Sequence, residues 1–381
     1  MPSLRSTKSI NQDRRMVDMS KKIALLQPSK TPFITLMSKL GKESAHNAIF
    51  HWLEDDLLVR WGKVAAAVGD GVITTIPVAA DTGGNFNVND VVKVPRTGEV
   101  FLITSITADA LTVVRGFGVT TAAALVENDP IVILGQAFNE GTGSPAPRTV
   151  NTTTQSNFTQ IFKTSVELTN TMEATKLYGG NDRAYQRKKK GIEHAIDISR
   201  SAWFGEKKEV TTGETVRRTT NGVMAMLGSD AKTYDASGSL TEANFEKLFL
   251  ENLFEYGSST KVLFAAPRVI SVINSWGKQK MEVDNMSKEY GLSIMRYESA
   301  HGTLKIVREP LFEGAVYGKM AVALDLEQIK YRPLNGRDTQ LDTNIQLPDE
   351  DKVKDQYITE AGFMLKLPKT HGILKGVDFP E

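Results

Sequence analysis

The 381-residue sequence contains no cysteine. Disulfide bonds, thiolate nucleophiles, cysteine-ligated zinc and iron–sulfur clusters are therefore excluded. The sequence also lacks a net charge of one sign, because 46 lysine and arginine residues face 45 aspartate and glutamate residues. A protein dedicated to nucleic-acid binding is usually strongly basic overall. Any functional positive charge must therefore be concentrated in part of the sequence.

Long apolar runs are absent as well, and no stretch approaches the length needed to cross a bilayer. The N-terminal stretch MPSLRSTKSINQDRR is polar and contains no apolar core of a secretory signal. We therefore predict no membrane partner and synthesis in the cytoplasm.

Motifs of common catalytic and metal sites are missing. The five histidines are scattered without a zinc-binding spacing, and the acidic stretches at 54–56 and 349–351 lack the spacing of a calcium loop. Neither a phosphate loop nor a G-x-S-x-G elbow is present. The sequence thus predicts a protein that is not an enzyme, with no catalytic residue, no cofactor and no metal ligand.

Positive charge is concentrated near the N-terminus, where the first 45 residues hold nine lysines and arginines against three acidic residues. They include two adjacent pairs, Arg14 with Arg15 and Lys21 with Lys22. Such an arm can bind polyanions or remain solvated. Within it, TPFITLMSKLG predicts a helix with Thr31 as its N-cap and Pro32 at its first position.

Alternating apolar and polar residues predict strands from about residue 45 to residue 171. Two extended stretches, HNAIFHWLEDDLL and TQSNFTQIFKTSVELTNT, are expected to form the two arms of one long hairpin. Short strands separated by turn signals lie between them, and they predict a small β-barrel or sandwich inserted at about 64–135. EGTGSPAPRT then predicts a flexible linker back to the second arm.

A long helix is predicted over 182–204 by the stretch DRAYQRKKKGIEHAIDISRSAWF. Asn181 or Asp182 can cap its start. Gly191 near its middle costs about 1 kcal/mol relative to alanine, so tertiary packing must stabilise the helix.

Two stripes run along this helix on a wheel of 100° per residue. The apolar stripe, which we expect to pack against the rest of the protein, consists of Tyr185, Ile192, Ile196 and Trp203. The opposite, basic stripe consists of Arg183, Arg187, Lys190 and His194, with Lys188 beside it in the same cationic run. Phosphate contacts need only accessible lysine and arginine, so the basic stripe fits a solvated helix face and a nucleic-acid surface equally well.

The C-terminal part mixes helices and strands. Thr241 is expected to cap the helix EANFEKLFLENLFEYG, KVLFAAP is a short buried strand, and Pro267 opens the next helix. Strand patterns return in GTLKIVREPLF, AVYGKMAVALDLEQIKYRPL and YITEAGFMLKLPKTHGILKGV. The predicted fold class is therefore α+β.

The order of these pieces resembles the major capsid proteins of tailed double-stranded DNA bacteriophages, which have the HK97-type fold. More narrowly, it is similar to the SU10-type major head protein family. The resemblance is carried by VPRTGEVFLITSI with LTVVRGFG, by NFTQIFKTSVELTNT leading into the long helix, and by GTLKIVREPL followed by VALDLEQIKYRPL. These stretches are spread over most of the chain.

The resemblance implies a division of the chain into the parts of that fold. They are an N-arm at 1–44, an E-loop hairpin with its inserted β-domain at 45–172, a peripheral domain with the spine helix at 173–225 and 336–381, and an axial domain at 226–335. It also implies self-assembly into hexamers and pentamers that form an icosahedral or prolate head. Each subunit would reach its hairpin over a neighbour, which would supply partners for the two long arms.

The resemblance implies partners too. The spine helix and N-arm of this fold face the shell interior, so the expected contacts of packaged double-stranded DNA are Arg14, Arg15, Lys21, Lys22, Arg183, Arg187, Lys188 and Lys190. Portal, scaffolding and decoration proteins are further expected partners. The expected location is the virion, after synthesis in the cytoplasm of a bacterial host. No covalent Lys–Asn crosslink is expected, because no pattern for one can be matched.

Two other functions stay open from the sequence. One is an encapsulin-like nanocompartment shell, against which the long chain and the inserted domain argue. The other is a polysaccharide-binding surface protein, which the β-rich middle with Trp52 and Trp61 suggests.

Overall fold

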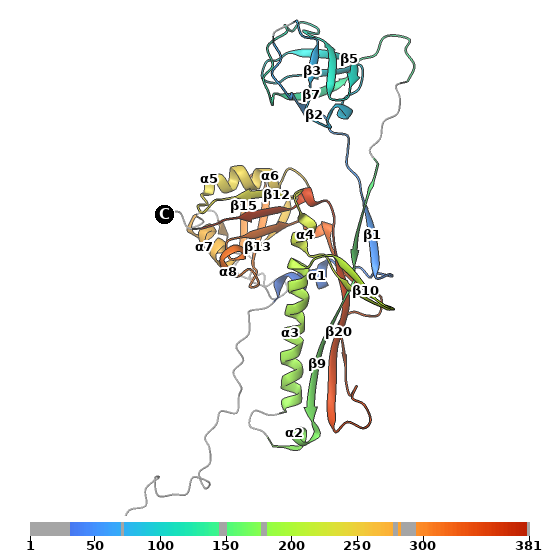
Figure 1. Ribbon diagram of the computed structural model, residues 1–381. Helices are drawn as coiled ribbons and strands as arrows, with labels where there is room; N and C mark the ends of the chain where they lie inside the picture. Colours follow the sequence, from blue (N-terminus) through green and yellow to red (C-terminus); the bar gives the residue numbers. More distant parts are fainter. Residues whose placement is uncertain are drawn as a thin grey trace, which may run out of the picture. The chain divides into compact units, whose positions relative to one another are not determined.

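The computed structural model describes residues 31–69, 72–144, 151–176, 181–276, 281–282 and 295–378 (Figure 1). It divides into two compact units, Met1–Trp52 with Gln155–Glu381 and Leu53–Thr154. The first unit combines helices and sheets, and the described residues of the second contain strands and one short 3₁₀ turn. The fold class is α+β, as the sequence predicts.

A seven-stranded mixed sheet forms the centre of the first unit, in the order β12-β21-β17-β13-β16-β15-β14. The strand bounds are β12 Lys232–Asp235, β13 Thr260–Ala265, β14 Met281–Glu282, β15 Met295–Ser299, β16 Gly302–Arg308, β17 Ala321–Leu324 and β21 Gly372–Lys375. Strand β17 is buried at every position, as expected for a central strand with both faces covered. Because β21 pairs with β12 and β17, the expected boundary at residue 336 divides a single sheet.

Helices flank this sheet (Figure 1). Their bounds are α4 Val223–Leu227, α5 Glu242–Asn244, α6 Glu251–Leu253, α7 Pro267–Trp276 and α8 Gly314–Tyr317, with a π-helical stretch at Phe245–Leu250 that joins α5 to α6. Thr241 caps α5 by accepting a hydrogen bond from the Asn244 N–H, and α7 begins at its proline, as predicted. Phe245, Phe249, Val269 and Val272 bury their side chains in the main core. Short 3₁₀ turns lie at Gly83–Asn85, Leu326–Gln328 and Pro368–Thr370.

A second sheet is built around the long strand β20. Its bounds are β9 Gln160–Thr169, β18 Ile329–Pro333, β19 Gln340–Asp342 and β20 Lys352–Leu365. Strands β18 and β19 pair with β20, and β9 pairs with it as well. The β9–β20 ladder is antiparallel and runs over ten residues, from Lys352 opposite Thr169 to Ala361 opposite Gln160.

The prediction of one long hairpin with two unpartnered arms is wrong in its second arm. The first arm is β1, Ile49–Glu54, which pairs with β8, Thr153–Phe158. The second predicted arm divides after Phe158, and its remaining part is β9, whose partner is β20. An alternating pattern identifies a strand and its buried face, but any antiparallel strand with a matching pattern can be its partner.

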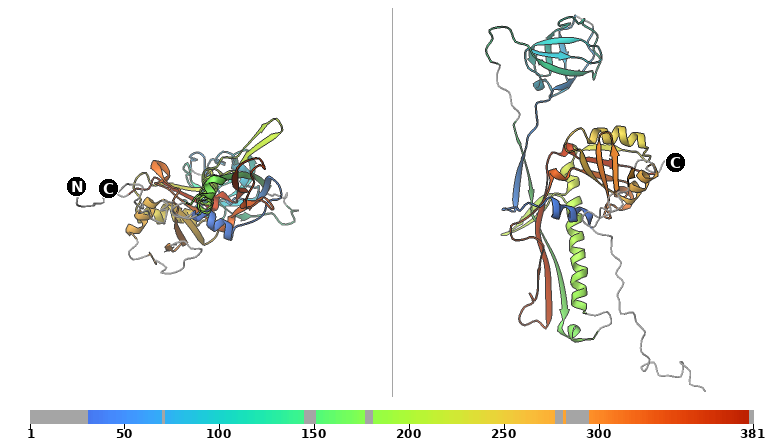
Figure 2. Two further views of the ribbon diagram at one scale, coloured as in Figure 1. Left: turned by 90° about the horizontal axis from the view of Figure 1, so that it is seen from below. Right: turned by 180° about the vertical axis from the view of Figure 1, so that it is seen from behind.

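An aromatic cluster connects the long helix α3 to the rest of the first unit. The helix bounds are α1 Pro32–Leu40, α2 Asn170–Ala174 and α3 Asp182–Phe204. Trp203 is fully buried, and its ring centroid lies 4.5 Å from that of Phe33 in α1, 4.8 Å from Phe312 and 5.4 Å from Phe264 in β13. Figures 1 and 2 both show α3 running alongside β9 and β20.

Strands β10, Lys208–Thr212, and β11, Thr215–Thr219, form a separate two-stranded hairpin after α3. Every residue of β10 is exposed. Arg218 and Glu209 pair across it at 2.7 Å.

The second unit is a closed barrel of six strands in the order β2-β7-β4-β5-β6-β3. Its strand bounds are β2 Trp61–Lys63, β3 Thr75–Pro77, β4 Asp90–Lys93, β5 Val100–Thr107, β6 Ala110–Val114 and β7 Pro130–Gln136. An antiparallel bridge between Val64 and Val78 joins the ends of β2 and β3, and so closes the barrel. Phe86, Phe101 and Ile103 belong to a core that is separate from that of the first unit.

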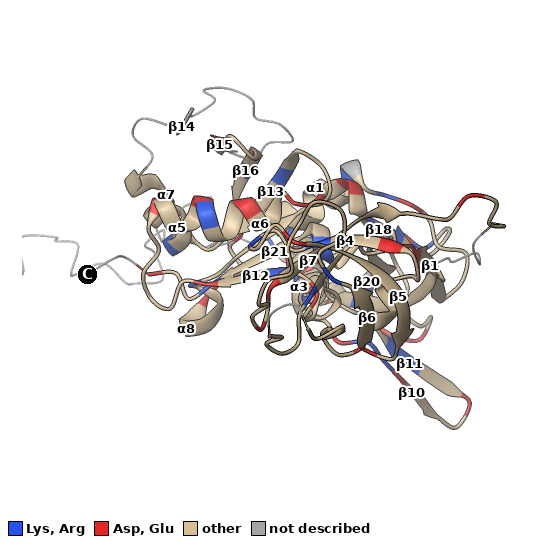
Figure 3. Cartoon of the chain, turned by 90° about the horizontal axis from the view of Figure 1, so that it is seen from above, with Lys and Arg blue, Asp and Glu red and all other residues tan. Residues whose placement is uncertain are grey.

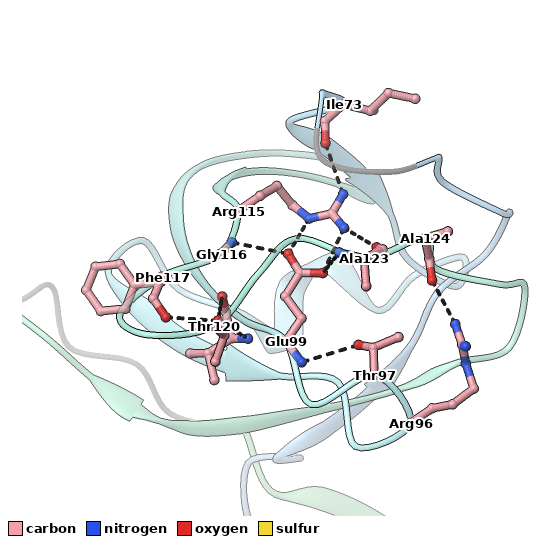
Figure 4. A network of polar contacts seen from close by, with 11 residues as sticks. Ile73, Arg96, Thr97, Glu99, Arg115, Gly116, Phe117, Thr120, Ala123 and Ala124 are labelled. Atoms are coloured by element: carbon pink, nitrogen blue, oxygen red, sulfur yellow. Dashed lines mark hydrogen bonds and ion pairs between the residues drawn. The ribbon is translucent and has the colours of Figure 1, made fainter.

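A buried ion pair stabilises one end of this barrel (Figure 4). The Arg115 Nε and Nη2 donate to the two Glu99 carboxylate oxygens at 2.6 and 2.8 Å, and both side chains are almost fully buried. Burial alone would raise the pKa of Glu99, but hydrogen bonds from Arg115 and from the Ala123 and Gly116 N–H groups lower it. Hydrogen bonds within the chain therefore stabilise the charged form of Glu99 inside the barrel.

Candidate assembly and nucleic-acid interface

Helix α3 begins where the sequence predicts. The Asn181 side chain accepts a hydrogen bond from the Ala184 N–H at 3.0 Å and so caps the first turn. Its neighbour Asp182 places a negative charge in that turn, which favours the positive end of the helix dipole.

The face of α3 that packs against the β9–β20 sheet is the one expected to be free. His194 is buried, and its ring nitrogens lie 2.9 Å from the Thr164 hydroxyl on β9 and 2.8 Å from the Thr359 hydroxyl on β20. The Tyr357 hydroxyl donates to the Arg187 carbonyl oxygen at 3.2 Å. Burial lowers the pKa of His194. The basic stripe therefore faces the sheet.

The predicted apolar stripe is correspondingly only half-buried. Tyr185, Ile192 and Ile196 are intermediate in exposure, and of the four predicted packing residues Trp203 alone is fully buried. Towards the C-terminal end of the helix, the buried residues are Ile198, Ser199, Ala202 and Trp203. Trp203 is packed as expected, but along the first turns of the helix the basic stripe lies against the sheet, because the sheet supplies polar and charged partners.

Asp355 on β20 is the partner that makes this packing possible. The Arg183 guanidinium binds its two carboxylate oxygens at 2.8 and 2.9 Å, and the Arg187 Nε donates at 2.7 Å. The Asp355 side chain is 1% exposed, against 17% for Arg183 and 29% for Arg187. The Asn344 N–H donates to it as well, at 3.0 Å. Arg183, with the help of Arg187 and Asn344, holds the pKa of Asp355 well below its usual range despite burial.

The other expected DNA-facing residues differ in their surroundings. Lys188 is exposed, whereas Lys190 pairs with Glu193 one turn further along the helix at 2.6 Å. Arg14, Arg15, Lys21 and Lys22 lie outside the described residues. Figure 3 shows lysine and arginine close to aspartate and glutamate on many of the same elements. Of the expected set, Arg183, Arg187 and Lys190 therefore have acidic partners within the chain.

Gly191 brings α3 close to the sheet. A Cβ atom at this position would lie 3.2 Å from the Tyr357 hydroxyl oxygen and 3.3 Å from its ring carbon Cζ. The ring of Tyr357 also stacks on that of His194, with centroids 5.9 Å apart. Glycine has no side chain, which allows this close approach. The packing therefore explains why residue 191 is a glycine, although glycine weakens an isolated helix.

The β1–β8 ribbon has one packed and one exposed face. Phe50 and Trp52 are buried against Met364, and the Arg332 guanidinium lies 5.1 Å from the centre of the Phe50 ring. On the opposite face, Ile49 is 37% exposed and Leu53 is 65% exposed. The ribbon therefore leaves apolar side chains exposed on this second face.

The described residues contain no group of three or more histidine, cysteine, aspartate or glutamate side chains that could hold a metal ion. Within the same residues, no helix is long and apolar enough to cross a membrane.

The SU10 major capsid protein family matches residues 4–378 of the chain. The chain belongs to this family. The matched range includes residues of both compact units. Membership decides for a capsid protein against an encapsulin-like shell and a polysaccharide-binding protein, and it makes the protein a structural component of a phage head.

Known capsid proteins share sequence or fold with this family member. A major capsid protein of Pseudomonas phage PaMx41 is 24% identical over 339 residues, which cover 84% of this chain and 79% of that protein. The capsid of a native GTA particle has a similar fold, with a TM-score of 0.50, 9% identity and coverage of 98% of this chain and 100% of that chain. The capsid of the empty GTA particle also gives 0.50, at 7% identity and 98% coverage of each chain. The fold is the HK97-like capsid fold, as the sequence resemblance implied.

Proposed function

We propose that copies of this chain assemble into hexamers and pentamers that close a head around packaged double-stranded DNA. In this proposal, the chain is made in the cytoplasm of a bacterial host and acts without catalysis. The N-arm is formed by residues 1–44, the E-loop by 45–172 and the axial part by 226–335. The peripheral part consists of 173–225 and 336–381, except that β21 belongs with the axial sheet. Portal, scaffolding and decoration proteins are the expected further partners.

The β1–β8 ribbon carries this proposal. A two-stranded sheet is marginally stable in water, and an exposed strand edge pairs readily with other chains. This ribbon is fixed to its own chain through Phe50 and Trp52, and Ile49 and Leu53 are exposed on its other face. A neighbouring subunit in a shell would cover that face and supply the missing contacts.

A charge placed on the exposed face of the ribbon tests the proposal. We expect the double variant Ile49→Glu with Leu53→Glu to keep the monomer folded but to prevent shell formation, because two carboxylates would be desolvated at every subunit contact. Assembly is measured by sedimentation and negative-stain microscopy, and folding by circular dichroism.

The matched control is Ser239→Glu, which adds a carboxylate to an exposed loop of the first unit. It should assemble like the unmodified protein. Normal shells from the double variant would contradict a role of the ribbon in assembly.

We further propose that Lys188 and the arm residues Arg14, Arg15, Lys21 and Lys22 contact DNA phosphates. The proposal leaves Arg183, Arg187 and Lys190 in supporting roles, since each has an acidic partner in the chain. Phosphate contacts of this kind depend on charge and not on sequence.

Charge reversal at Lys188 tests whether the exposed lysine of α3 contacts DNA. We expect Lys188→Glu to leave stability unchanged and to lower the amount of DNA retained per head at raised salt, measured from the absorbance ratio of purified heads. Lys247→Glu, at an exposed lysine of the π-helical stretch, is the control for added negative charge. DNA retention equal to that of the unmodified head would remove Lys188 from the interface.

A further inference from the structure

A buried carboxyl group lies where helix α1 meets the rest of the first unit. Glu309 directly follows β16, and its side chain is fully buried. Its backbone N–H donates to the Ala265 carbonyl oxygen at the end of β13, at 3.0 Å, which fixes its position beside the central sheet. An acidic residue is almost never fully buried unless it is paired. The surroundings of Glu309 therefore need an explanation.

The carboxyl group of Glu309 has few partners. The Leu311 N–H donates to its Oε1 at 3.3 Å, which is long for a bond of this kind. Among the described residues, neither Oε2 of Glu309 nor the indole Nε1 of Trp203 has a hydrogen-bond partner, and both atoms are buried. Buried polar atoms without a partner are rare, because each of them loses its contacts with water and gains none in return.

The first turn of α1 faces this carboxyl group. Thr31 occupies the N-cap position, as predicted, but its side chain makes no capping hydrogen bond. The Phe33 N–H and the Trp203 indole instead approach Glu309, and the rings of Phe33 and Trp203 lie 4.5 Å apart. Glu309 therefore lies at the positive end of the helix dipole, where a capping side chain is normally found.

No cation of the described residues forms an ion pair with Glu309. The charged side chains of the surrounding elements are exposed or bound elsewhere: Arg308 and Glu313 of its own segment, Arg200 of α3, Lys39 of α1, Lys261 of β13 and Arg268 of α7. Burial raises the pKa of Glu309 from its ordinary value of 4.5 to about 7, although the N–H groups of Leu311, Trp203 and Phe33 oppose the shift. The ionised form is therefore costly at this position.

We propose that Glu309 is a proton-dependent latch for helix α1. The neutral carboxyl group fits its buried position and lets α1 pack against Trp203. The carboxylate needs more donors than this position offers, and water can supply them only when α1 separates from Trp203. Since α1 lies within residues 1–44, ionisation of Glu309 loosens the attachment of the predicted N-arm.

The direction of the pH effect follows from the raised pKa of Glu309. Because the folded protein favours the neutral form, its stabilisation is complete below about pH 4.5 and is lost as the pH rises through about 7. Attachment of α1 is therefore firm in acid and weak in alkali. The inference goes beyond the proposed function, because it concerns a single chain and does not require assembly.

Hydrogen–deuterium exchange of the purified full chain, followed by mass spectrometry, tests the inference. The protection factor of a peptide over 32–40 is compared at about pH 6 and about pH 8.5, after correction for the intrinsic effect of pH on exchange. We expect this protection factor to fall about tenfold at the higher pH, while protection over 352–365 in β20 stays unchanged.

Two variants assign the effect to one carboxyl group. Glu309→Gln places a neutral group of the same shape at this position, and we expect the pH dependence of α1 to disappear. The matched control is Glu313→Gln, which removes an exposed carboxylate from the loop before α8 and should keep the tenfold change.

An unmodified protein whose α1 protection does not change with pH would overturn the inference, and this measurement does not depend on the folding of any variant. An equal change in Glu309→Gln, or an equal change throughout the chain, would overturn it as well. None of these outcomes bears on whether the unmodified chain forms shells, so the proposed function is tested separately.

Discussion

At the scale of single residues, Asp355 determines how the long helix packs. Two arginines one turn apart would repel each other against an apolar sheet, and burial of either without a partner would be costly. Asp355 binds both, and its own charge is stabilised by the Asn344 N–H. Three charged groups thus occupy a packing interface because every carboxylate oxygen has donors.

Removal of the negative charge of Asp355 should destabilise the fold strongly. We expect Asp355→Asn to lower the free energy of unfolding by about 3 kcal/mol, because Arg187 would lose its counter-ion and Arg183 would keep only the longer contact to Glu173 at 3.6 Å, while both guanidinium groups remain largely covered. Urea unfolding of the unassembled protein measures the change. Asp349→Asn, at an exposed site nearby in sequence, should change stability by less than about 0.5 kcal/mol. A loss at Asp355 as small as that of the control would show that the cluster does not stabilise the fold.

Residue-scale pairing was only partly predictable. The sequence indicated Asn181 or Asp182 as the cap of α3, and the structure uses Asn181. It indicated Thr241 as another cap, because caps depend on neighbours two or three residues away. Asp355 lies more than a hundred residues from Arg183 along the chain, and its acidic side chain in an alternating strand resembles any solvated strand position. Its role follows from the β9–β20 pairing, which local patterns do not specify.

At the scale of elements, α3 and the β9–β20 sheet are fitted to one another at Gly191. The helix range Asp182–Phe204 was predicted from its cap, its length and its periodicity. The periodicity also defined two faces of the helix, but which face is buried depends on the sheet.

A larger side chain at Gly191 should separate the helix from the sheet. We expect Gly191→Leu to lower the free energy of unfolding by about 2 kcal/mol, since overpacking against Tyr357 outweighs the gain in helix propensity. Ala184→Leu, at an exposed position of the same helix, should be nearly neutral. Thermal unfolding followed by circular dichroism compares the two. A stabilised Gly191→Leu protein would contradict the close approach.

At the scale of the whole molecule, the two units and the family membership together describe a shell subunit. The family match extends over residues 4–378, and the native GTA capsid covers 98% of the chain, so no large part of it lacks a counterpart. Order of elements along the chain was sufficient to suggest this family, because insertion of a barrel between two strands followed by a long helix is a global pattern. The pairing of β9 with β20 was not predictable in that way, since the resemblance itself suggested that both arms seek partners on a neighbour.

Negative-stain electron microscopy of the purified unmodified protein shows whether the chain assembles. We expect closed shells, together with hexameric or pentameric rings at low concentration. A homogeneous field of monomers across a wide range of protein concentration and salt would contradict it.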